Sequence, residues 1–436
     1  MLGGCRHRRR DSSQVPPHRA EVFSGPLTGR VRREEVLVRV LLSSRPSYGH
    51  TFPLFPLARA LVASGHTVVF ATDAPMLDEV TARGFSTRRV GPSIAWAEAE
   101  TRRRYPELAS LPTAEQWRFG SALYGDVLPA AVAQSLAPIL LEERPDLIVF
   151  DPADFGAALA GGLRGIPVVR HAAGRGWTRP MRGGADRPPP QFAEMAKYLD
   201  ALWRGLGGPQ PCVDAFAGQA YIETWPEGLR DPYTEQLTTR LLMRTDTSEP
   251  ALGHACEWLS RLRTRPLVYV TLGTVVFPID AYRMVIDAFD MVGVDAIVST
   301  GRTGDPEALG PPSDHVRIVD FVAQESILPH VNAVLHHCGS GSMLGSLAAG
   351  LPALGLPMGG DQFLNAEALR DSGSGLVLEP EHVSTTAVAS ALHELLTNSS
   401  FRVAAESVRD RIQSMPAPEE VVRQLEEIVG RFSADR

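Results

Sequence analysis

The chain has 436 residues, a length that favours two domains, and its composition of 44% hydrophobic and 21% charged residues is typical of a globular protein. Its net charge of −7 and pI near 6.0 argue against nucleic acid or an anionic membrane surface as a partner, since both attract a basic face. No apolar run is long enough to cross a bilayer, and the four cysteines are scattered without metal or disulfide spacing, so we expect a reduced, cytoplasmic location.

The first 35 residues predict a disordered extension. They contain clusters of arginine, the pair Pro16-Pro17 and no hydrophobic periodicity, and they lack the apolar core of a secretory signal. Regular structure is predicted to begin at Val36, where a run of Val and Leu residues starts.

Residues 36–243 predict the first of two α/β domains. Short runs of Val, Ile and Leu alternate with longer amphipathic segments along this part of the chain. Strands that are apolar throughout and are followed by helices are typical of a doubly wound parallel sheet, which is covered on both faces. The predicted strands are 36–44, 67–72, 147–150 and 168–170, and the predicted helices are 52–64 and 155–163.

The same pattern restarts after a linker predicted at 244–265. Two halves of this kind imply a cleft between them, and ligands of parallel sheets bind beyond the carboxyl ends of the strands. A final amphipathic helix is predicted within 416–436. The second domain, 266–415, has predicted strands at 267–274, 296–300, 316–319, 333–336 and 353–355.

The most informative segment follows the fourth predicted strand of the second domain. It reads His337-Cys338-Gly339-Ser340-Gly341-Ser342 and continues as a helix predicted at 342–349. A glycine turn that leads into a helix presents unpaired N–H groups and the positive end of the helix dipole. Such a place binds phosphate well, so we predict a diphosphate held by the N–H groups of Gly341, Ser342 and Met343. Tight packing of the helix on the strand is the alternative explanation of the glycines.

Two polar side chains mark a candidate acid–base pair in the first domain. His50 follows the first predicted strand, and Asp151 follows the strand predicted at 147–150, so both lie at one edge of the sheet. An imidazole suits proton abstraction near neutral pH, and a carboxylate can hold it in the required tautomer. Loop capping by His50 and helix capping by Asp151 are the alternatives, and Asp154 and Asp126 are weaker candidates for the carboxylate.

At these residues the chain resembles the family 1 glycosyltransferases of GT-B fold, and most closely the bacterial enzymes that glycosylate natural products such as antibiotics. The resemblance implies two Rossmann-like domains that face a central cleft, with an acceptor bound by the first domain and a nucleotide-sugar by the second. It also implies that the helix within 416–436 packs back on the first domain. It covers 36–432 and rests on the order and spacing of Tyr48-Gly49-His50-Thr51-Phe52-Pro53, Gly273-Thr274, Phe321-Val322-Ala323-Gln324 and the block 337–362.

The resemblance implies roles for the residues that match these motifs. His50 matches the general base of an inverting transfer, and Asp151 matches the acid that pairs with it in related plant enzymes. His337 and Gly339 match the His-x-Gly pattern that faces the donor diphosphate, and the Gly273-Thr274 turn would lie opposite them. The adjacent histidine, His336, points to the other face of the strand, where we expect a structural role.

The remaining matches concern the base and the sugar of the donor. Phe321 takes the place of a tryptophan that stacks on the base in the plant enzymes, with Val322 and Gln324 completing the base-binding loop. An ordinary core aromatic is the alternative for Phe321. Asp361 and Gln362 would bond the sugar hydroxyls, because a carboxylate and an amide are rich in acceptors; a plain surface loop is their alternative.

Two departures from the family pattern affect these predictions. The plant-type motif has a glutamate that holds both ribose hydroxyls, whereas this chain has Gly345 at that position. A missing ribose clamp fits a deoxyribose donor, so we favour a dTDP-sugar over a UDP-sugar. Ala323 replaces the proline that usually precedes Gln324, which leaves the base-binding loop less rigid.

The sequence therefore predicts an inverting transferase that moves a sugar, such as a deoxysugar, from a nucleoside diphosphate to a hydroxyl of a small hydrophobic aglycone. The segments 94–136 and 174–211 are predicted to line the acceptor pocket. Core packing explains some of their aromatic residues equally well. These aromatic residues, which suit a polyketide or other flat acceptor, are Trp96, Trp117, Phe119, Trp177 and Trp203.

No metal and no cofactor other than the nucleotide-sugar is expected. The chain has no Asp-x-Asp motif and no His and carboxylate cluster with metal spacing, so a helix dipole and His337 would offset the leaving-group charge. An oxidoreductase fits less well, because Gly345 follows Gly339 and Gly341 one position too late for the dinucleotide fingerprint. A UDP-sugar transferase, a nucleotide-sugar epimerase or cell-wall transferase on this fold, a non-catalytic sugar-nucleotide-binding protein and a homodimer all stay open.

Overall fold

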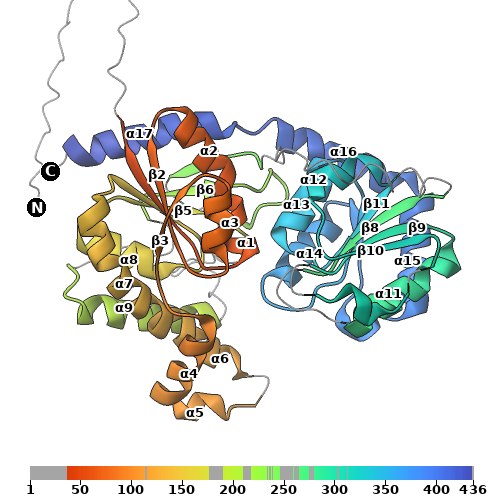
Figure 1. The fold of residues 1–436 in the computed structure, drawn as a ribbon, viewed down its shortest axis with the longest axis horizontal. Coiled ribbons are helices and arrows are strands. Elements are labelled where there is room, and N and C mark those ends of the chain that lie inside the picture. The colour runs from red at the N-terminus through yellow and green to blue at the C-terminus, as the bar shows by residue number, and fades with distance from the viewer. Residues whose placement is uncertain are drawn as a thin grey trace, which may run out of the picture. The chain divides into compact units, whose positions relative to one another are not determined.

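The structure of the chain is a computed structural model (Figure 1). The predictions for 1–35, for most of 244–265, and for Thr274 and Trp177 concern positions outside the residues that the structure describes. Those residues are 37–112, 115–175, 190–209, 218–232, 234, 237, 239–245, 259, 265–273, 279–301, 304–311 and 313–434.

The first half of the described chain forms a seven-stranded parallel sheet in the order β3-β2-β1-β4-β5-β6-β7. Leu41 at the centre of β1 pairs with Val69 on one side and Ile148 on the other. The order reverses between β1 and β4, so the loops that follow these two strands lie side by side. The strands are β1 Arg39–Ser43, β2 Thr67–Thr72, β3 Ser86–Arg89, β4 Leu147–Phe150, β5 Val168–His171, β6 Ala220–Glu223 and β7 Arg240–Leu242.

Alternate residues of these strands point to opposite faces, and both faces are covered by helices. Val40 and Leu42 join a buried cluster with α2 (Phe55–Ala63), whereas Leu41 joins one with α7 (Leu128–Glu143). The apolar strand runs follow from this double burial. Short segments α1 (Tyr48–Thr51) and a 3-10 turn (Phe52–Leu54) precede α2, and the other covering helices are α3 (Met76–Ala82), α8 (Phe155–Leu163) and α9 (Pro190–Gly205).

The second half forms a six-stranded parallel sheet in the order β10-β9-β8-β11-β12-β13. Its strands are β8 Leu267–Thr271, β9 Asp295–Ser299, β10 Val316–Val319, β11 Ala333–His336, β12 Ala353–Gly355 and β13 Gly375–Val377. Helices cover both faces here too, and the predicted class of two doubly wound parallel-sheet domains is confirmed. The helices are α11 Ile279–Val292, α12 Gln324–Ile327, α13 Ser340–Ala348, α14 Gln362–Asp371, α15 Thr385–Thr397 and α16 Ser399–Gln413.

The last helix, α17 (Pro418–Ala434), completes the core of the first half, as Figure 1 shows for the helix that runs beside α2. Its apolar residues, among them Val421 and Leu425, are buried in the same cluster as Val40 of β1. A polar contact reinforces this packing, because Nε2 of the buried His66 lies 3.0 Å from a carboxylate oxygen of Glu426. The predicted return of the final helix to the first domain is therefore confirmed.

Replacing Leu425 by alanine is expected to lower the free energy of unfolding by about 2–5 kcal/mol, because it leaves a cavity in a fully packed core. Leu425 is 2% exposed, whereas Val403 on α16 is 64% exposed and provides the control. Val403→Ala should change stability by no more than about 0.5 kcal/mol. Urea unfolding followed by circular dichroism measures both variants, and equal stabilities would contradict the packing of α17.

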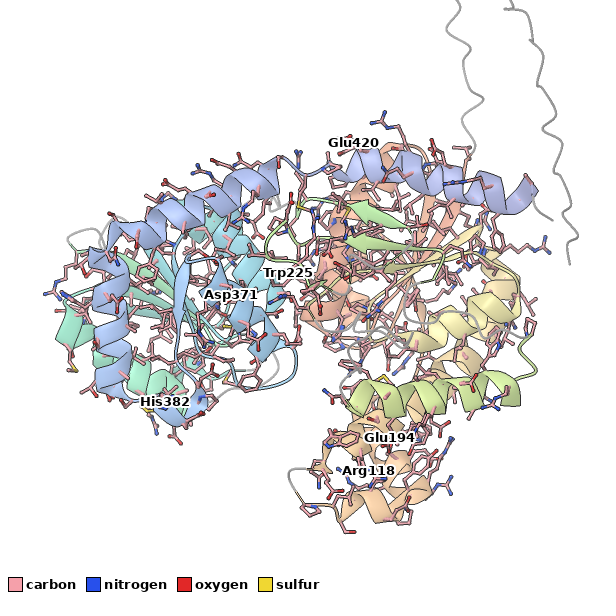
Figure 2. The ribbon with its side chains drawn as sticks, turned by 180° about the vertical axis from the view of Figure 1, so that it is seen from behind. Arg118, Glu194, Trp225, Asp371, His382 and Glu420 are labelled. Atoms are coloured by element: carbon pink, nitrogen blue, oxygen red, sulfur yellow. The ribbon has the colours of Figure 1, made fainter. Side chains whose placement is uncertain are left out.

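A group of helices between β3 and β4 was not predicted in detail. It contains α4 (Ile94–Arg104), α5 (Pro106–Ala109) and α6 (Trp117–Ala122), and α6 continues through a π-helical turn at Leu123–Val127 into α7. Arg118 on α6 and Glu194 on α9 form an ion pair at 3.4 Å, which ties this group to the rest of the domain (Figure 2).

One helical stretch in this region bears on the prediction that no segment spans a membrane. By length and composition alone, Trp117–Glu143 could cross a bilayer, with a mean hydropathy of 1.3 over its most apolar window. Leu136 and Leu140 of this stretch are buried against Phe155 and Leu159 of α8 in the domain core. Core helices of globular proteins share this composition, so the stretch gives only weak support for a span.

Candidate active site

The predicted site residues lie in loops at the carboxyl ends of central strands. His50 is in α1, which follows β1, and Asp151 follows β4, the neighbour of β1 in the sheet. His337 follows β11, whose neighbours are β8 and β12. Both sheets are parallel, so each loop emerges at the edge where ligands of such sheets bind.

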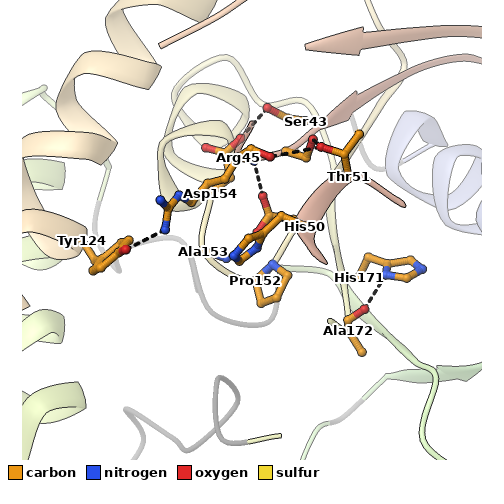
Figure 3. Close-up of polar contacts among 12 residues, drawn as sticks. Ser43, Arg45, His50, Thr51, Tyr124, Pro152, Ala153, Asp154, His171 and Ala172 are labelled. Atoms are coloured by element: carbon orange, nitrogen blue, oxygen red, sulfur yellow. Dashed lines mark hydrogen bonds and ion pairs between the residues drawn. The ribbon is translucent and has the colours of Figure 1, made fainter. Parts of the chain in front are cut away.

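His50 and Asp151 form a hydrogen-bonded pair. Nδ1 of His50 lies 2.8 Å from Oδ1 of Asp151, and the surroundings of the pair are drawn in Figure 3. The His50 side chain is 22% exposed, whereas the Asp151 side chain is 1% exposed. A buried carboxylate that accepts from Nδ1–H leaves Nε2 of a neutral imidazole able to accept a proton, which is the arrangement that a general base needs.

The loop around Asp151 keeps its carboxylate ionised. Burial alone would raise the pKa of Asp151, but the charge and hydrogen bond of His50 and two backbone N–H groups outweigh burial and lower it. The two N–H groups belong to Arg45, 2.6 Å from Oδ2, and Ala153, 2.8 Å from Oδ1. The alternative that Asp151 only caps α8 is not what the contacts show, because Asp154 is the residue at the start of that helix.

A second buried carboxyl group belongs to Asp154, three residues after Asp151. Asp154 is 5% exposed, and its Oδ2 accepts a hydrogen bond of 2.6 Å from the Ser43 hydroxyl at the end of β1 (Figure 3). Burial raises the pKa of Asp154 to about 7, and the charge of Asp151 adds to that rise. Asp151 and not Asp154 is hydrogen-bonded to His50, so the weaker candidate is not the partner of this histidine.

The glycine turn after β11 differs in one respect from the prediction. Cys338 takes a left-handed conformation with φ of 62°, which turns the chain sharply enough for α13 to begin at Ser340 rather than at 342. The N–H of Met343 donates to the Gly339 carbonyl at 2.9 Å, so it is already used within the helix. The N–H groups of Ser340, Gly341 and Ser342 have no acceptor within the helix, because they belong to its first turn. Ser340 therefore replaces Met343 as a candidate donor to the diphosphate.

His337 lies between two glycines. A Cβ atom added to Gly273 would come within 3.3 Å of its Nε2, and one added to Gly339 would overlap that atom. Gly273 has φ of 110°, a backbone conformation that favours glycine. Burial lowers the pKa of His337 to about 4, so the ring is neutral at pH 7 and can offer a ligand a hydrogen bond but no positive charge. The prediction that His337 offsets the charge of the leaving diphosphate stays a prediction, since it concerns the ring with a ligand beside it.

If dTDP is the nucleotide of the donor, as the sequence predicts, replacing Gly339 by alanine is expected to weaken its binding about tenfold or more, because the new methyl group displaces His337 from its place beside the turn. Gly430→Ala on α17 is the control, since a Cβ there meets nothing within 4 Å. Isothermal titration calorimetry with dTDP measures both variants. An unchanged affinity in Gly339→Ala would show that the position of His337 does not matter for the nucleotide.

The predicted base-binding loop connects β10 to α12. Phe321 is 36% exposed, which argues against the alternative of an ordinary core aromatic, and Val322 packs partly buried against the domain core. The Gln324 side chain donates to the Ser342 carbonyl at 3.1 Å. A Cβ on Gly345 would lie 2.5 Å from Nε2 of Gln324, so the space of the missing ribose-binding glutamate is filled by this amide.

The two predicted sugar-binding residues have different surroundings. Asp361 precedes α14; burial raises its pKa, while a hydrogen bond from Asn365 and the charge of His50 oppose that rise. The influence of His50 places Asp361 within electrostatic range of the proposed base. Oε1 of Gln362 accepts from the N–H groups of Met358 and Gly359 at 2.8 and 3.2 Å. The side-chain carbonyl of Gln362 therefore stabilises its own loop. Only the NH₂ of this side chain stays available for a sugar hydroxyl.

Three residues that the motifs did not single out lie near these groups. Arg45 donates to the Tyr124 hydroxyl at 2.7 Å, and its guanidinium lies 4.8 Å from the centre of that ring (Figure 3). His171, at the end of β5, is buried with its pKa lowered to about 4 by burial. Asn365 bonds both Asp361 and the glycine turn. Of the three, only Asn365 could have been found from the sequence. It lies four residues after Asp361, and residues four apart on a helix share a face.

The predicted acceptor-side aromatics divide into two kinds. Trp96 is 47% exposed on α4, and Phe119 packs partly buried against a small cluster that contains Ala97. Trp203 is fully buried in the core, where its Nε1 donates to the Pro209 carbonyl at 2.8 Å, so it supports the fold and lines no pocket. Trp117 is partly buried at the start of α6.

Comparison with known families and proteins decides what kind of protein carries this site. Residues 59–273 match the N-terminal domain of the erythromycin biosynthesis protein CIII-like family, and residues 283–428 match its C-terminal domain. The chain belongs to this family. It is a glycosyltransferase of family 1 and GT-B fold, of the kind that transfers sugars to natural-product aglycones, as the resemblance predicted.

Individual relatives cover almost the whole glycosyltransferase. L-demethylnoviosyl transferase of Streptomyces niveus is 31% identical over 397 residues, which are 89% of this chain and 97% of that one. The 3-alpha-mycarosylerythronolide B desosaminyl transferase of Saccharopolyspora erythraea is 27% identical, with 90% and 99% covered. TDP-daunosamine transferase DnrS of Streptomyces peucetius is 25% identical, with 90% and 98% covered.

Solved structures support the fold of the glycosyltransferase. Spinosyn forosaminyltransferase SpnP superposes with a TM-score of 0.71 at 25% identity over 90% of this chain and 100% of that one. The calicheamicin glycosyltransferase CalG4 superposes with a TM-score of 0.73 at 20% identity over 91% and 99% of the two chains.

Proposed function

We propose that this glycosyltransferase moves a deoxysugar from a dTDP-sugar to a hydroxyl of a small hydrophobic aglycone, such as a polyketide, with inversion at the anomeric carbon. The observation that carries the proposal is the contact of 2.8 Å between Nδ1 of His50 and the buried Asp151 carboxylate. His50 is the general base, and Asp151 holds its tautomer.

The reaction follows from that pair. Nε2 of His50 takes the proton of the acceptor hydroxyl as its oxygen forms a bond to the anomeric carbon. The bond from that carbon to the diphosphate breaks on the opposite face, and the bonding electron pair leaves with the diphosphate. Asp151 stabilises the imidazolium that results, since its own carboxylate is kept ionised by its neighbours.

The start of α13 is assigned to the departing diphosphate. No side chain caps this helix, so its first N–H groups and its dipole can meet the developing negative charge. The neutral His337 adds a hydrogen bond. We propose that no divalent metal takes part; among the residues that the structure describes, no three His, Cys, Asp or Glu side chains are grouped as a metal site.

The preference for dTDP rests on Gly345 and Gln324. Because the Gln324 amide occupies the place of a ribose clamp, a 2′-hydroxyl would meet no carboxylate there. A buried hydroxyl without a partner costs about 1–3 kcal/mol. The name of the relative TDP-daunosamine transferase, which specifies a thymidine diphosphate donor, supports the same choice.

Calorimetric titration with dTDP, dUDP and UDP, all in EDTA, tests the proposal. The comparison of dUDP with UDP isolates the 2′-hydroxyl, and that of dTDP with dUDP isolates the methyl group. We expect dTDP to bind at least about fivefold more tightly than UDP, because the 2′-hydroxyl of UDP would be buried without a hydrogen-bond partner. Equal or tighter binding of UDP would contradict the dTDP assignment, and binding only after magnesium is restored would contradict independence from metal.

The proposal also covers the location of the enzyme and the surface that the acceptor contacts. We place the enzyme in the cytoplasm, where nucleotide-sugars are available, with no cofactor besides its donor. The acceptor would contact the helices α4 and α6, where Trp96 presents apolar surface and Trp117 is partly buried.

A further inference from the structure

Asn365 lies at the centre of a buried hydrogen-bond network that joins the glycine turn to Asp361. It is 0% exposed on α14. Its Nδ2 lies 2.9 Å from the Cys338 carbonyl, and 3.3 Å from both the Ser340 hydroxyl and Oδ2 of Asp361. One amide group thus contacts the turn, the first residue of α13 and the residue assigned to the sugar.

The bond to the Cys338 carbonyl matters most for the diphosphate. Cys338 is in the left-handed region with φ of 62°, a conformation that costs a non-glycine residue free energy and persists only when its surroundings hold it. The peptide that Asn365 holds is the one that aims the following Gly339 and Ser340 into the helix. The direction of the first N–H groups of α13 therefore depends on this side chain.

The oxygen of the same amide faces the first half of the enzyme. Oδ1 of Asn365 accepts a hydrogen bond of 3.2 Å from the N–H of Arg175, just beyond β5. The Arg175 guanidinium donates to the carbonyl of Leu364, the neighbour of Asn365, at 2.6 Å. A Cβ on Gly174 would overlap Oδ2 of Asp361, so this approach needs glycine. Asn365 therefore connects the turn to the segment that leads into the proposed acceptor side.

We propose that Asn365 is a positioning residue for sugar transfer: it fixes the diphosphate-binding turn and Asp361 and ties both to the Gly174-Arg175 segment. The inference rests on the proposed function, since it assigns the turn to the diphosphate. Asn365 itself touches no substrate. Its effect reaches the ligand through the N–H groups of α13 and through the Asp361 carboxylate.

Calorimetric titration of the full chain with dTDP and with thymidine tests this role. Asn365→Ala removes all four contacts without adding charge, and it should weaken dTDP about tenfold or more, as loss of a buried hydrogen-bonding group implies. Thymidine, which has no phosphate, should bind within about twofold of its wild-type affinity. Asn398→Ala is the control: Asn398 caps α16 through the Ser400 N–H, so its loss should lower Tm without changing dTDP affinity.

The outcomes separate the inference from the function on which it rests. Wild-type protein that binds dTDP beside an Asn365→Ala variant that binds it equally overturns the role of Asn365 alone. An equal loss of dTDP and thymidine affinity also overturns it, because that result describes general damage to the domain. Wild-type protein that binds no dTDP overturns the proposed donor. If Asn365→Ala does not fold, Ser340→Ala removes one branch of the network, and an unchanged dTDP affinity then counts against the inference.

Discussion

Replacing His50 by alanine is expected to lower the rate of sugar transfer about 10²–10⁴-fold, the contribution typical of general-base catalysis. The variant loses the only group of the His50–Asp151 pair that can take the acceptor proton. Binding of dTDP should change little, because the proposed diphosphate contacts come from α13 and from His337. The loss should therefore fall on kcat.

Transfer can be followed by release of dTDP with an accepted aglycone, alongside calorimetric binding of dTDP. His315→Ala is a suitable control. His315 directly precedes β10, the edge strand of the second sheet, and pairs with Asp290. It should leave kcat within about twofold of wild type if the effect is specific to His50. A His50→Ala variant with wild-type kcat would place the base elsewhere.

Replacing Asp151 by asparagine is expected to lower kcat by about 10²-fold or more, because an amide in place of the carboxylate no longer fixes the productive tautomer of His50. The substitution keeps the size of the side chain. It removes the negative charge that stabilises the imidazolium formed during transfer, and the N–H groups of Arg45 and Ala153 then face a weaker acceptor.

The double variant with His50→Ala and Asp151→Asn gives the sharper measurement. Residues that act as one unit have non-additive effects, so the double variant should be about as slow as His50→Ala alone. Rate losses that multiply would show that Asp151 acts independently of His50. Circular dichroism of each variant checks that the buried Asp151 position still folds.

The fold could be predicted from the sequence where strands are buried on both faces, because such strands appear as short runs of apolar residues. The strands at Thr67–Thr72, Leu147–Phe150 and Ala333–His336 have the predicted bounds, because central parallel strands are apolar throughout. The helix α4 was not predicted, since its second half, Glu98 to Arg104, consists mostly of charged residues and shows no apolar stripe. The start of α13 was misplaced by two residues, because nothing local reveals the left-handed turn at Cys338.

The site divides in a similar way. His50 and Asp151 could be found because acid–base residues at strand ends carry a chemical signature, and the structure places their side chains 2.8 Å apart. Arg45 could not be found, since its importance lies in contacts between segments far apart in the chain, whereas Asn365 could have been noticed only from its spacing of four residues from Asp361. Gln324 shows the same limit: its amide fills the space above Gly345, although twenty-one positions separate them.

The last helix has a consequence for engineering by recombination. Residues of α17 complete the core of the first half, and the His66–Glu426 contact joins positions at opposite ends of the chain. A chimaera that joins the first half of one parent to the second half of another therefore mismatches this core if it has a single crossover near the linker. Two crossovers are needed, so that the stretch from Pro418 onward comes from the parent that supplies the acceptor-side half.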